Sequence, residues 1–361
     1  MTEDEMLRKM VAPGTPRPGK YLQGIIQIHI TRACDRACYH CTQASQIGGK
    51  TSFMTPDQFR AACESLCGYF GVVGVFGGNP ALSPHFEAYC SIIKEYFPRR
   101  QRGIWCNNPV TVEKAALMRA TFDPTHSNLN VHQDRKAYDL FKKGWPECGP
   151  VGLDKDSRHS PCYVAMKDVL RKDCEGCFGM GEVPDNSAAN YGPGKDGNKR
   201  CEQCGGTGKV YDREAAHELI SKCDINQHWS AMIGVFRGEL RAWFCEIAGA
   251  QAILHQDEPD YPDTGLDLRY WLPDQNDYYW WQQPMGTFAH QVRKHCHDCG
   301  VPMKGHGELA NAADGVEQVS ETHAAVYKPK RVGRRVELMT VREQLGEPLD
   351  RMTKYIQNGG K

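Results

Sequence analysis

The sequence predicts an α/β fold in which parallel strands form a partly open barrel with helices on the outside. Short apolar runs bounded by glycine, proline or asparagine are typical of buried strands. They are expected at 24–31, 71–76, 103–107, 127–132 and 160–167. Segments with helical periodicity separate the first of these runs. They are expected at about 55–70, 83–96 and 111–120. A group of cysteines directly follows the first run, where the end of a barrel strand would carry a site.

The first helix has the clearest start signal. Thr55 is an N-cap residue, Pro56 suits the first helical position, and Gln58 completes a capping box. Apolar residues then recur every three or four positions from Phe59 to Phe70, which gives the helix one apolar face. A segment of this kind between two buried strands is what a βαβ unit requires.

Cys34, Cys38 and Cys41 lie in one loop after the first predicted strand. Three thiolates in so short a loop can hold three irons of a [4Fe–4S] cube, and no fourth cysteine follows at ferredoxin spacing. The fourth iron would therefore be open to bind a small molecule. On spacing alone, a zinc site or a chance group of cysteines is the alternative.

This motif resembles that of radical S-adenosylmethionine (SAM) enzymes, C-x3-C-x2-C with an aromatic residue before the last cysteine, a place that His40 takes here. The resemblance implies a partial (β/α)6-type barrel and a [4Fe–4S] cluster on Cys34, Cys38 and Cys41. It also implies that SAM binds the open iron through its amino and carboxylate groups. Reduction of SAM then gives methionine and a 5′-deoxyadenosyl radical.

A glycine pair, Gly77 and Gly78, ends the second predicted strand. In the family a Gly-Gly-Glu turn takes this place, and its backbone binds the SAM amino group. Asn79 replaces the glutamate, so the resemblance carries over the backbone role but no role of a carboxylate. Polar residues at the ends of the third and fourth strands are candidates for contact with SAM or substrate, with loop hydrogen bonding as the alternative. They are Asn107, Asn108, Asn128, Asn130 and His132.

Two copies of C-x2-C-x-G-x-G predict a structural zinc site. The first holds Cys174 and Cys177, and the second holds Cys201 and Cys204. Four thiolates make a closed tetrahedral zinc site without an open position, which is typical of a structural ion. The repeat resembles the zinc-binding modules of DnaJ-type chaperones. Such a module could grip a macromolecular substrate or brace a loop.

A third set of cysteines surrounds a predicted β-hairpin at about 229–245. Cys223 precedes the hairpin, Cys245 ends it, and Cys296 and Cys299 follow fifty residues later. The layout is similar to the twitch/SPASM extensions of radical SAM enzymes, which carry an auxiliary [4Fe–4S] cluster. The family's glycine before the second cysteine is displaced here, which leaves the individual ligands open. A second zinc on the same four thiolates is the alternative.

The expected organisation is therefore a radical SAM barrel with a zinc-knuckle insert and a small hairpin-containing auxiliary-cluster domain. Its parts are a polar surface leader (1–20), the barrel (21–170), the zinc insert (171–210), a last barrel helix (211–222), the auxiliary-cluster domain (223–310) and a C-terminal tail (311–361).

Composition indicates the cellular environment and the kinds of partner to expect. Lys plus Arg and Asp plus Glu both number 44 in 361 residues, so net charge gives no signal for nucleic acid or membrane. No run of eighteen apolar residues is present, and the first residues lack a signal-peptide core. Grouped cysteines without a secretory signal indicate metal sites in a reducing cytoplasm. The expected partners are SAM and a reductant of the flavodoxin or ferredoxin type.

The predicted function is enzymatic. A 5′-deoxyadenosyl radical would abstract hydrogen from a substrate carbon, leading to modification or isomerase-type rearrangement of a side-chain-like group on a larger molecule. A modified nucleobase, such as a hypermodified thymidine of phage DNA, and a peptide are the two carriers considered. Oxidation, epimerisation or decarboxylation of a peptide or small metabolite is the alternative. A non-catalytic zinc-dependent binding protein is the hypothesis from another class.

Overall fold

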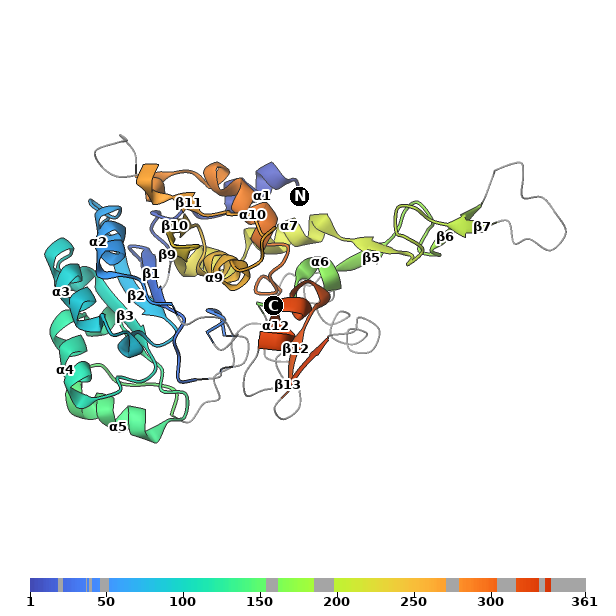
Figure 1. Ribbon diagram of the computed structural model, residues 1–361. Helices are drawn as coiled ribbons and strands as arrows, with labels where there is room; N and C mark the ends of the chain where they lie inside the picture. The colour runs from blue at the N-terminus through green and yellow to red at the C-terminus, as the bar shows by residue number, and fades with distance from the viewer. Residues whose placement is uncertain are drawn as a thin grey trace.

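One mostly parallel sheet runs through the computed structural model (Figure 1). Across the sheet, the strands are β11 (Leu266–Asp267), β10 (Glu239–Trp243), β9 (Ser230–Phe236), β1 (Ile25–Thr31), β2 (Val72–Gly77), β3 (Arg102–Cys106) and β4 (Asn128–Leu129). The strands β9, β1, β2, β3 and β4 run parallel to one another. β10 pairs antiparallel with β9, and β11 pairs antiparallel with β10. The structure describes residues 1–18, 22–36, 38, 41–45, 52–153, 162–184, 198–270, 279–303, 316–330 and 335–338.

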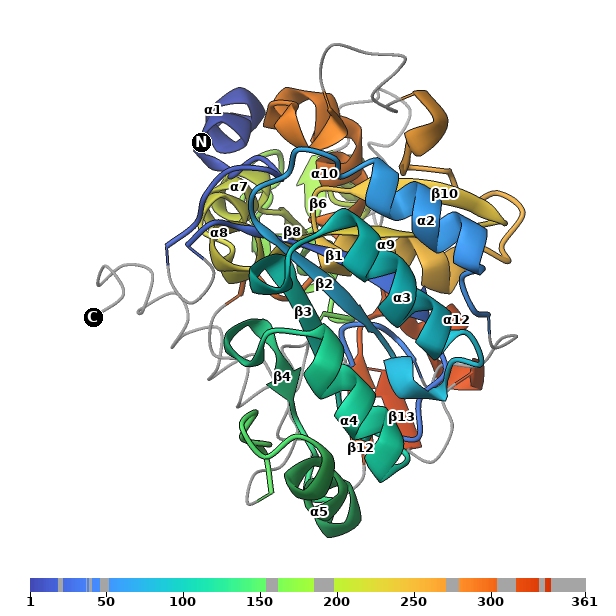
Figure 2. The ribbon, with the colours of Figure 1, turned by 90° about the vertical axis from the view of Figure 1, so that its left-hand side faces the viewer.

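Helices cover the sheet on both sides. Figure 2 shows α2 (Pro56–Glu64), α3 (Phe86–Tyr96) and α4 (Val112–Thr121) along one face, with α5 (Arg135–Gly144) beside α4. On the other side α9 (Glu246–His255) packs against β9 and β10, and every residue of α9 is buried. The expected start of α2 is confirmed, because the Thr55 hydroxyl accepts from the Gln58 amide in a capping box.

Successive side chains of β1 point alternately to the two faces of the sheet. Ile26, Ile28 and Ile30 are buried in the main hydrophobic core. Gln27 points to the opposite face, where it lines a cavity. The run of isoleucines thus makes β1 a buried central strand, and its polar residue marks the functional face.

The strand expected at 160–167 is wrong for the described residues, which begin at Cys162. They form a buried turn that leads into the short helix α6 (Met166–Val169). Their backbone is satisfied by a distant loop: the Ser320 amide donates to the Tyr163 carbonyl, and the Ala165 amide donates to the Ser320 hydroxyl at 2.9 Å. A short buried apolar run has the same sequence pattern in either case, so periodicity could not distinguish them.

The hairpin expected in a separate auxiliary-cluster domain belongs to the main sheet. β9 pairs in parallel with β1, with Ile25 opposite Ser230, and β10 pairs antiparallel with β9. β9 takes the free edge of β1, and at the other edge the described residues beyond β4 add a parallel bridge between Asn130 and Val151. β9 suits a central position in the main sheet, because all but one of its residues are buried and both of its faces are therefore covered.

The N-terminal segment is not a surface leader. Residues Glu3–Lys9 form α1, and the side chain of Met6 is fully buried. Asn226, in α8 (Asp224–His228), bonds both the amide and the carbonyl of Val11. The helix α7 (Arg213–Ser221), expected as the last barrel helix, packs against α1. Buried polar contacts of this kind dock the segment firmly on the body.

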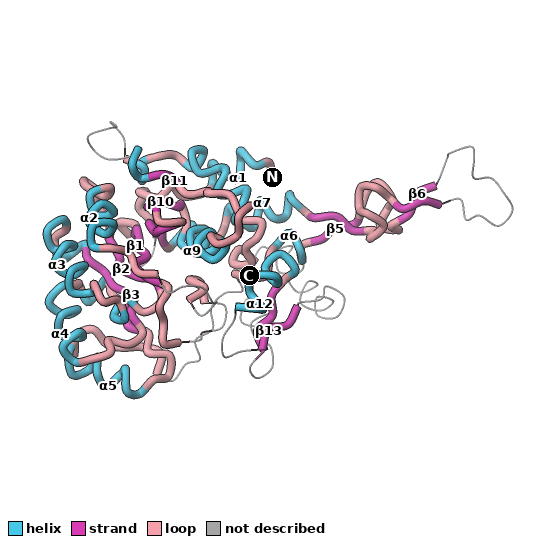
Figure 3. The backbone as a smooth tube through the Cα atoms, viewed as in Figure 1, coloured by secondary structure: helices cyan, strands magenta, loops and turns pink. Residues whose placement is uncertain are grey.

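The insert forms an arm that projects from the body (Figures 1 and 3). Two antiparallel ribbons build it. β5 (Arg171–Asp173) pairs with β8 (Lys209–Tyr211), and farther out β6 (Glu182–Pro184) pairs with β7 (Asn198–Arg200). The two predicted cysteine pairs lie between these ribbons.

Part of the expected C-terminal tail is structured. β12 (Val316–Val319) and β13 (Arg335–Leu338) are parallel and are joined across α12 (Glu321–Lys330). His323 bonds the Asp298 carbonyl at 2.6 Å, just after α10 (Ala289–His295). Residues 339–361 lie outside the described part of the chain.

Candidate active site and two further cysteine sets

A cavity of about 380 Å³ lies on the face of the sheet opposite α2 to α4, and the cysteine loop forms part of its wall. Its volume is in the range of small-molecule sites. Eight of the residues predicted to bind the cluster or SAM line it together. They are Cys34, Cys38, Cys41, Gly77, Gly78, Asn107, Asn128 and Asn130. His40 lies outside the described residues.

The glycine turn after β2 is fastened to the cysteine loop through the backbone. The Gly78 amide donates to the Thr31 carbonyl at 2.8 Å, and the Asn79 amide donates to the Ala33 carbonyl at 2.6 Å. A Cβ atom on Gly78 would lie 2.2 Å from the Ala33 oxygen, so a side chain there would push the loop away. Both glycines are therefore needed for the close approach of two loops.

Asn79 is fully buried and does not line the cavity. Its amide nitrogen donates to the Asn108 carbonyl at 2.9 Å and to the Asp35 carboxylate at 3.2 Å. Its amide oxygen accepts from the Ala81 backbone at 3.2 Å. The side chain ties the cysteine loop to the ends of β2 and β3, so any contact with SAM is left to its backbone, as the sequence predicts.

Asn107 bonds a cysteine of the loop directly. Its amide nitrogen lies 3.3 Å from the sulfur of Cys34. Burial raises the pKa of the Cys34 thiol to about 12. A thiol in this environment becomes a thiolate when a metal binds it, and an N–H donor aimed at the sulfur stabilises that form.

Two interactions that the sequence did not reveal hold the cysteine loop. The Asp35 carboxylate accepts from the Asn108 amide at 2.6 Å. Arg36 pairs with Asp134, the N-cap residue of α5. Asn108 and Asp134 lie far from the cysteine loop in sequence. Of the residues in these two interactions, only Asn108 was predicted from the sequence to lie at the site.

The opposite wall of the cavity carries a polar triad that sequence reasoning missed. The Gln27 amide nitrogen donates to the Glu246 carboxylate at 2.7 Å and to the Ser230 hydroxyl at 2.6 Å. The Ser230 hydroxyl in turn donates to the same carboxylate oxygen at 2.8 Å. Burial raises the pKa of Glu246 to about 7, against the hydrogen bonds from Ser230 and Gln27. The one sequence signal was a glutamine among the isoleucines of β1.

Cys223, Cys245, Cys296 and Cys299 line a second, small cavity with mainly apolar walls. Met10 of the N-terminal segment closes part of it. Burial raises the pKa of Cys223 to about 11, and burial together with the neighbouring thiols raises the pKa of Cys296 well above its usual range. Three of these cysteines are buried and Cys296 is partly buried. Four such thiols facing one cavity can all ionise only around a cation, so this set suits a metal centre.

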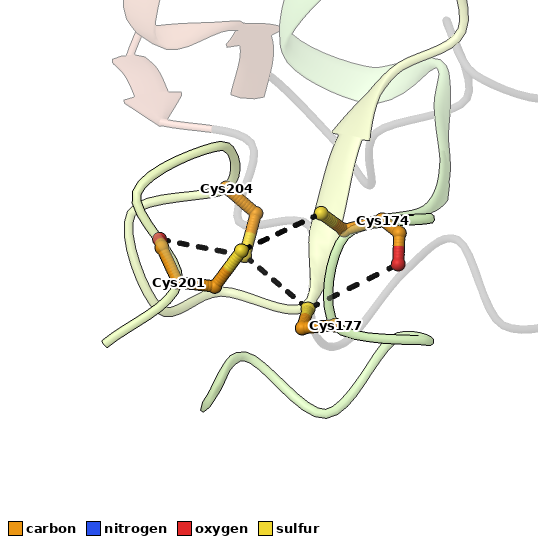
Figure 4. Close-up of side chains that lie close together, drawn as sticks. All are labelled: Cys174, Cys177, Cys201 and Cys204. Carbon is orange, nitrogen blue, oxygen red and sulfur yellow. Dashed lines mark hydrogen bonds between the residues drawn. The ribbon is translucent and has the colours of Figure 1, made fainter. Parts of the chain in front are cut away.

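The four cysteines of the arm face one another closely (Figure 4). The sulfurs of Cys174 and Cys201 are 3.8 Å apart, and those of Cys177 and Cys204 are 3.7 Å apart. A tetrahedral zinc with bonds of about 2.3 Å places its sulfurs about 3.8 Å apart. The residues therefore fit a single tetrahedral ion.

The glycines of the two knuckles have a geometric role. The Gly181 amide donates to the Cys177 sulfur at 3.2 Å, and the Gly208 amide donates to the Cys204 sulfur at 3.3 Å. Both glycines have positive φ, and a Cβ on Gly208 would lie 2.1 Å from the Gly179 oxygen. The repeated motif thus reads as two equivalent knuckles wrapped around one site.

Spacing distinguishes the three cysteine sets. In the described part of the chain, only the arm cysteines form a group of three or more metal-ligating residues whose ligand atoms all lie within 4.8 Å of one another. A cube that binds one thiolate at each corner iron spaces its thiolates more widely than a single ion does. The close spacing of the arm set is compatible with one ion.

Within the described residues, no helix has the length and apolar character needed to cross a bilayer.

Part of the chain is similar to a known family of proteins. Residues 28–141 match the model of the Radical SAM superfamily, a range that includes the cysteine loop and the glycine turn. Over 177 residues the chain is 23% identical to the S-adenosyl-L-methionine-dependent 2-deoxy-scyllo-inosamine dehydrogenase of Niallia circulans. That match covers 47% of this chain and 65% of the dehydrogenase, slightly less than two thirds of its length.

The crystal structure of BtrN in complex with AdoMet and 2-DOIA is also similar, with 15% sequence identity and a TM-score of 0.40. The similarity covers 76% of this chain and 92% of BtrN.

Proposed function

We propose that this chain is an enzyme that cleaves SAM reductively in the cavity beside β1, because residues 28–141 match the Radical SAM superfamily model. The observation that carries the proposal is the convergence of three cysteines, the glycine turn and Asn107 on one cavity of suitable size. A [4Fe–4S] cluster with SAM bound to it supplies a 5′-deoxyadenosyl radical, which abstracts hydrogen from a substrate carbon.

The residues fit that cofactor. Cys34, Cys38 and Cys41 would hold three irons, and the cavity beside them leaves room for SAM at the fourth. The Asn107 amide stabilises the Cys34 thiolate. The backbone of Gly77 and Gly78, which line the cavity, would contact the SAM amino group. The chain's own task is to orient SAM and substrate and to exclude water, since the radical chemistry belongs to the cofactors.

The reaction proposed first is the modification or rearrangement of a side-chain-like group on a larger molecule. A modified nucleobase and a peptide are the proposed carriers. A second candidate is dehydrogenation of a small metabolite, with oxidation, epimerisation and decarboxylation as related outcomes. The similarity to the dehydrogenase of Niallia circulans favours the second candidate.

Cys223, Cys245, Cys296 and Cys299 would hold the auxiliary [4Fe–4S] cluster. Four cysteines around one buried cavity suggest that all four irons are ligated, which favours electron transfer over binding of substrate. A flavodoxin- or ferredoxin-type partner would supply electrons. Cys174, Cys177, Cys201 and Cys204 would hold a structural zinc that braces the arm. A binding protein with zinc in all three sets is the alternative from another class.

The test is anaerobic reconstitution with iron and sulfide, followed by addition of dithionite and SAM. The expected product is 5′-deoxyadenosine, from protein with about eight irons and about one zinc. Cys34→Ala should abolish the product. Cys67→Ala, which changes an exposed cysteine outside the three sets, should leave it unchanged. Absence of 5′-deoxyadenosine from a zinc-only protein would refute the proposal.

A further inference from the structure

The wall of the cavity formed by Gln27 and Glu246 is built as a binding surface. Gln27 is 1% exposed and Glu246 is 7% exposed, yet both line the cavity. They come from β1 and from the first turn of α9, and β9 packs against both elements. Ser230 on β9 joins them by accepting from Gln27 and donating to Glu246. The positions of both side chains are thus fixed by two strands and one helix of the core.

These hydrogen bonds also fix which way the Gln27 amide faces. The Gln27 amide nitrogen lies 2.7 Å from the Glu246 carboxylate and 2.6 Å from the Ser230 hydroxyl, so its NH₂ group is the one that faces both residues. The amide oxygen of Gln27 then remains as an acceptor, and this buried atom has no hydrogen-bond partner in the described part of the chain. Buried polar atoms are rarely left unpaired, so a ligand that donates a hydrogen bond is the fitting occupant.

Other lining residues add an acceptor and a negative charge, beside donors such as Trp105 and Trp229. The amide nitrogen of Asn107 is used by the Cys34 sulfur, and its oxygen is buried without a partner. Asp224 supplies a second carboxylate to the lining. Among the described residues that line the cavity, none is a lysine or an arginine. A cation that donates hydrogen bonds is therefore favoured over an anion.

The position of this wall relates it to the auxiliary cysteines. Asp224 follows Cys223 and Glu246 follows Cys245, and both acids face the cavity while both cysteines face the second cavity. Ile225 lines both cavities. A group bound at Glu246 is therefore separated from the cavity of Cys223 and Cys245 by a single layer of residues. The cysteine loop lines the same cavity as Glu246.

We propose that Gln27 and Glu246 form a subsite that binds a protonated aliphatic amine of the substrate. Glu246 provides the charge, Gln27 accepts a second hydrogen bond, and Ser230 holds Glu246 in place. The subsite deepens the proposed function, on which it rests for the assumption that substrate enters this cavity. Its role is to position the substrate relative to SAM.

The test uses two probes of the same shape, n-butylamine and n-butanol, with the anaerobic, oxidised, SAM-loaded holoenzyme. Their dissociation constants are measured by ligand-observed NMR. The amine should bind about tenfold or more tightly than the alcohol, as expected for hydrogen bonds to a charged group. Glu246→Gln should remove this preference. Gln27→Met, which keeps length and removes the acceptor, should weaken it. Glu87→Gln, an exposed acid on α3, should retain it.

Equal binding of the two probes by the wild type, or an amine preference that survives Glu246→Gln, would overturn the subsite. Iron content and the thermal midpoint of each variant show whether it has folded. Formation of 5′-deoxyadenosine without substrate is measured in parallel. Its absence from the wild type would refute the proposed function, whereas its presence together with equal probe binding would refute the subsite alone.

Discussion

At the scale of residues, a single hydrogen bond is expected to set the reduction potential of a cluster held by the cysteine loop. Asn107 donates to the Cys34 sulfur, and donors of this kind stabilise the reduced, more negative state of an iron–sulfur cluster. Asn107→Leu should therefore lower the reduction potential of the cluster. A hydrogen bond of about 1 kcal/mol corresponds to about 40 mV for one electron.

A redox titration followed by EPR would measure the shift. Asn128→Leu serves as the matched control, because Asn128 lines the same cavity but its side chain makes no contact with Cys34 among the interactions observed. An unchanged potential in Asn107→Leu, or an equal shift in both variants, would contradict the assigned role.

His29 makes stability depend on pH. Burial, with a further effect of Arg32, lowers its pKa from 6.5 to about 3. Below pH 6.5 the unfolded chain binds a proton that the folded chain does not, so the free energy of unfolding falls with pH until the folded pKa is reached. Between pH 7.5 and pH 5.5 the loss should be about 1.4 kcal/mol.

Chemical denaturation of the wild type and of His29→Gln at both pH values would measure this difference. The variant should lose less stability than the wild type by about the amount above. The same loss in both proteins would show that His29 is already protonated in the fold, or that other groups dominate.

The sequence predicted the residues of the site where short spacing carried the information. The cysteine loop and the arm cysteines are local motifs, and the structure places each group as one unit. Gln27 and Glu246 are 219 positions apart and meet only because β9 aligns beside β1. Neither belongs to a motif, so the sequence alone gave no reason to pair them.

At the scale of elements, the glycine turn after β2 has the strictest geometry. A Cβ on Gly78 would lie 2.2 Å from the Ala33 carbonyl oxygen, which is backbone and cannot move aside cheaply. Gly78→Ala should therefore displace the cysteine loop and lower both the iron bound on reconstitution and the yield of 5′-deoxyadenosine, by about tenfold if the displacement costs about 1.4 kcal/mol.

Gly286→Ala is the matched control, since nothing lies within 4 Å of the added atom and the residue is not among those with positive φ. Its iron content and yield should equal those of the wild type. A Gly78→Ala protein with full iron and full activity would show that the turn does not position the loop.

Elements were predictable where periodicity or caps were strong. The strands at β1, β2 and β3 and the start of α2 follow from apolar runs and a capping box. The apolar run near Tyr163 predicts a strand, but it forms a turn. Its apolar residues are buried against α12, a segment more than 150 residues later in the chain. Burial explains an apolar run but does not say which backbone partner satisfies it.

At the scale of the whole molecule, the proposed iron–sulfur sites and the proposed zinc site lie in different parts of the structure. The cavity and the auxiliary cysteines share the body, whereas the zinc-type cysteines lie between two ribbons in the projecting arm (Figure 1). Replacing both Cys174 and Cys204 by serine should therefore remove about one zinc and leave the iron content and SAM cleavage within about twofold of wild type. Elemental analysis and the 5′-deoxyadenosine assay would check this, and loss of iron would contradict it.

Long-range packing was the least predictable feature at this scale. The N-terminal segment appeared polar, yet Met6 and Met10 are buried and Met10 lines the auxiliary cavity. Proline and glycine in residues 11–19 gave the segment the composition of a surface linker. Hydrogen bonds from Asn226 fix it to the body instead, and such contacts leave no periodic signal.

The central claim is that SAM binds at the cluster held by Cys34, Cys38 and Cys41. EPR spectra of the dithionite-reduced holoenzyme, recorded before and after addition of SAM, test it most directly. One of two cluster signals should change when SAM is added, and Cys34→Ala should lack that signal while keeping the other. Spectra that SAM leaves unchanged in the wild type, or a protein that holds zinc and no reducible cluster, would contradict the claim.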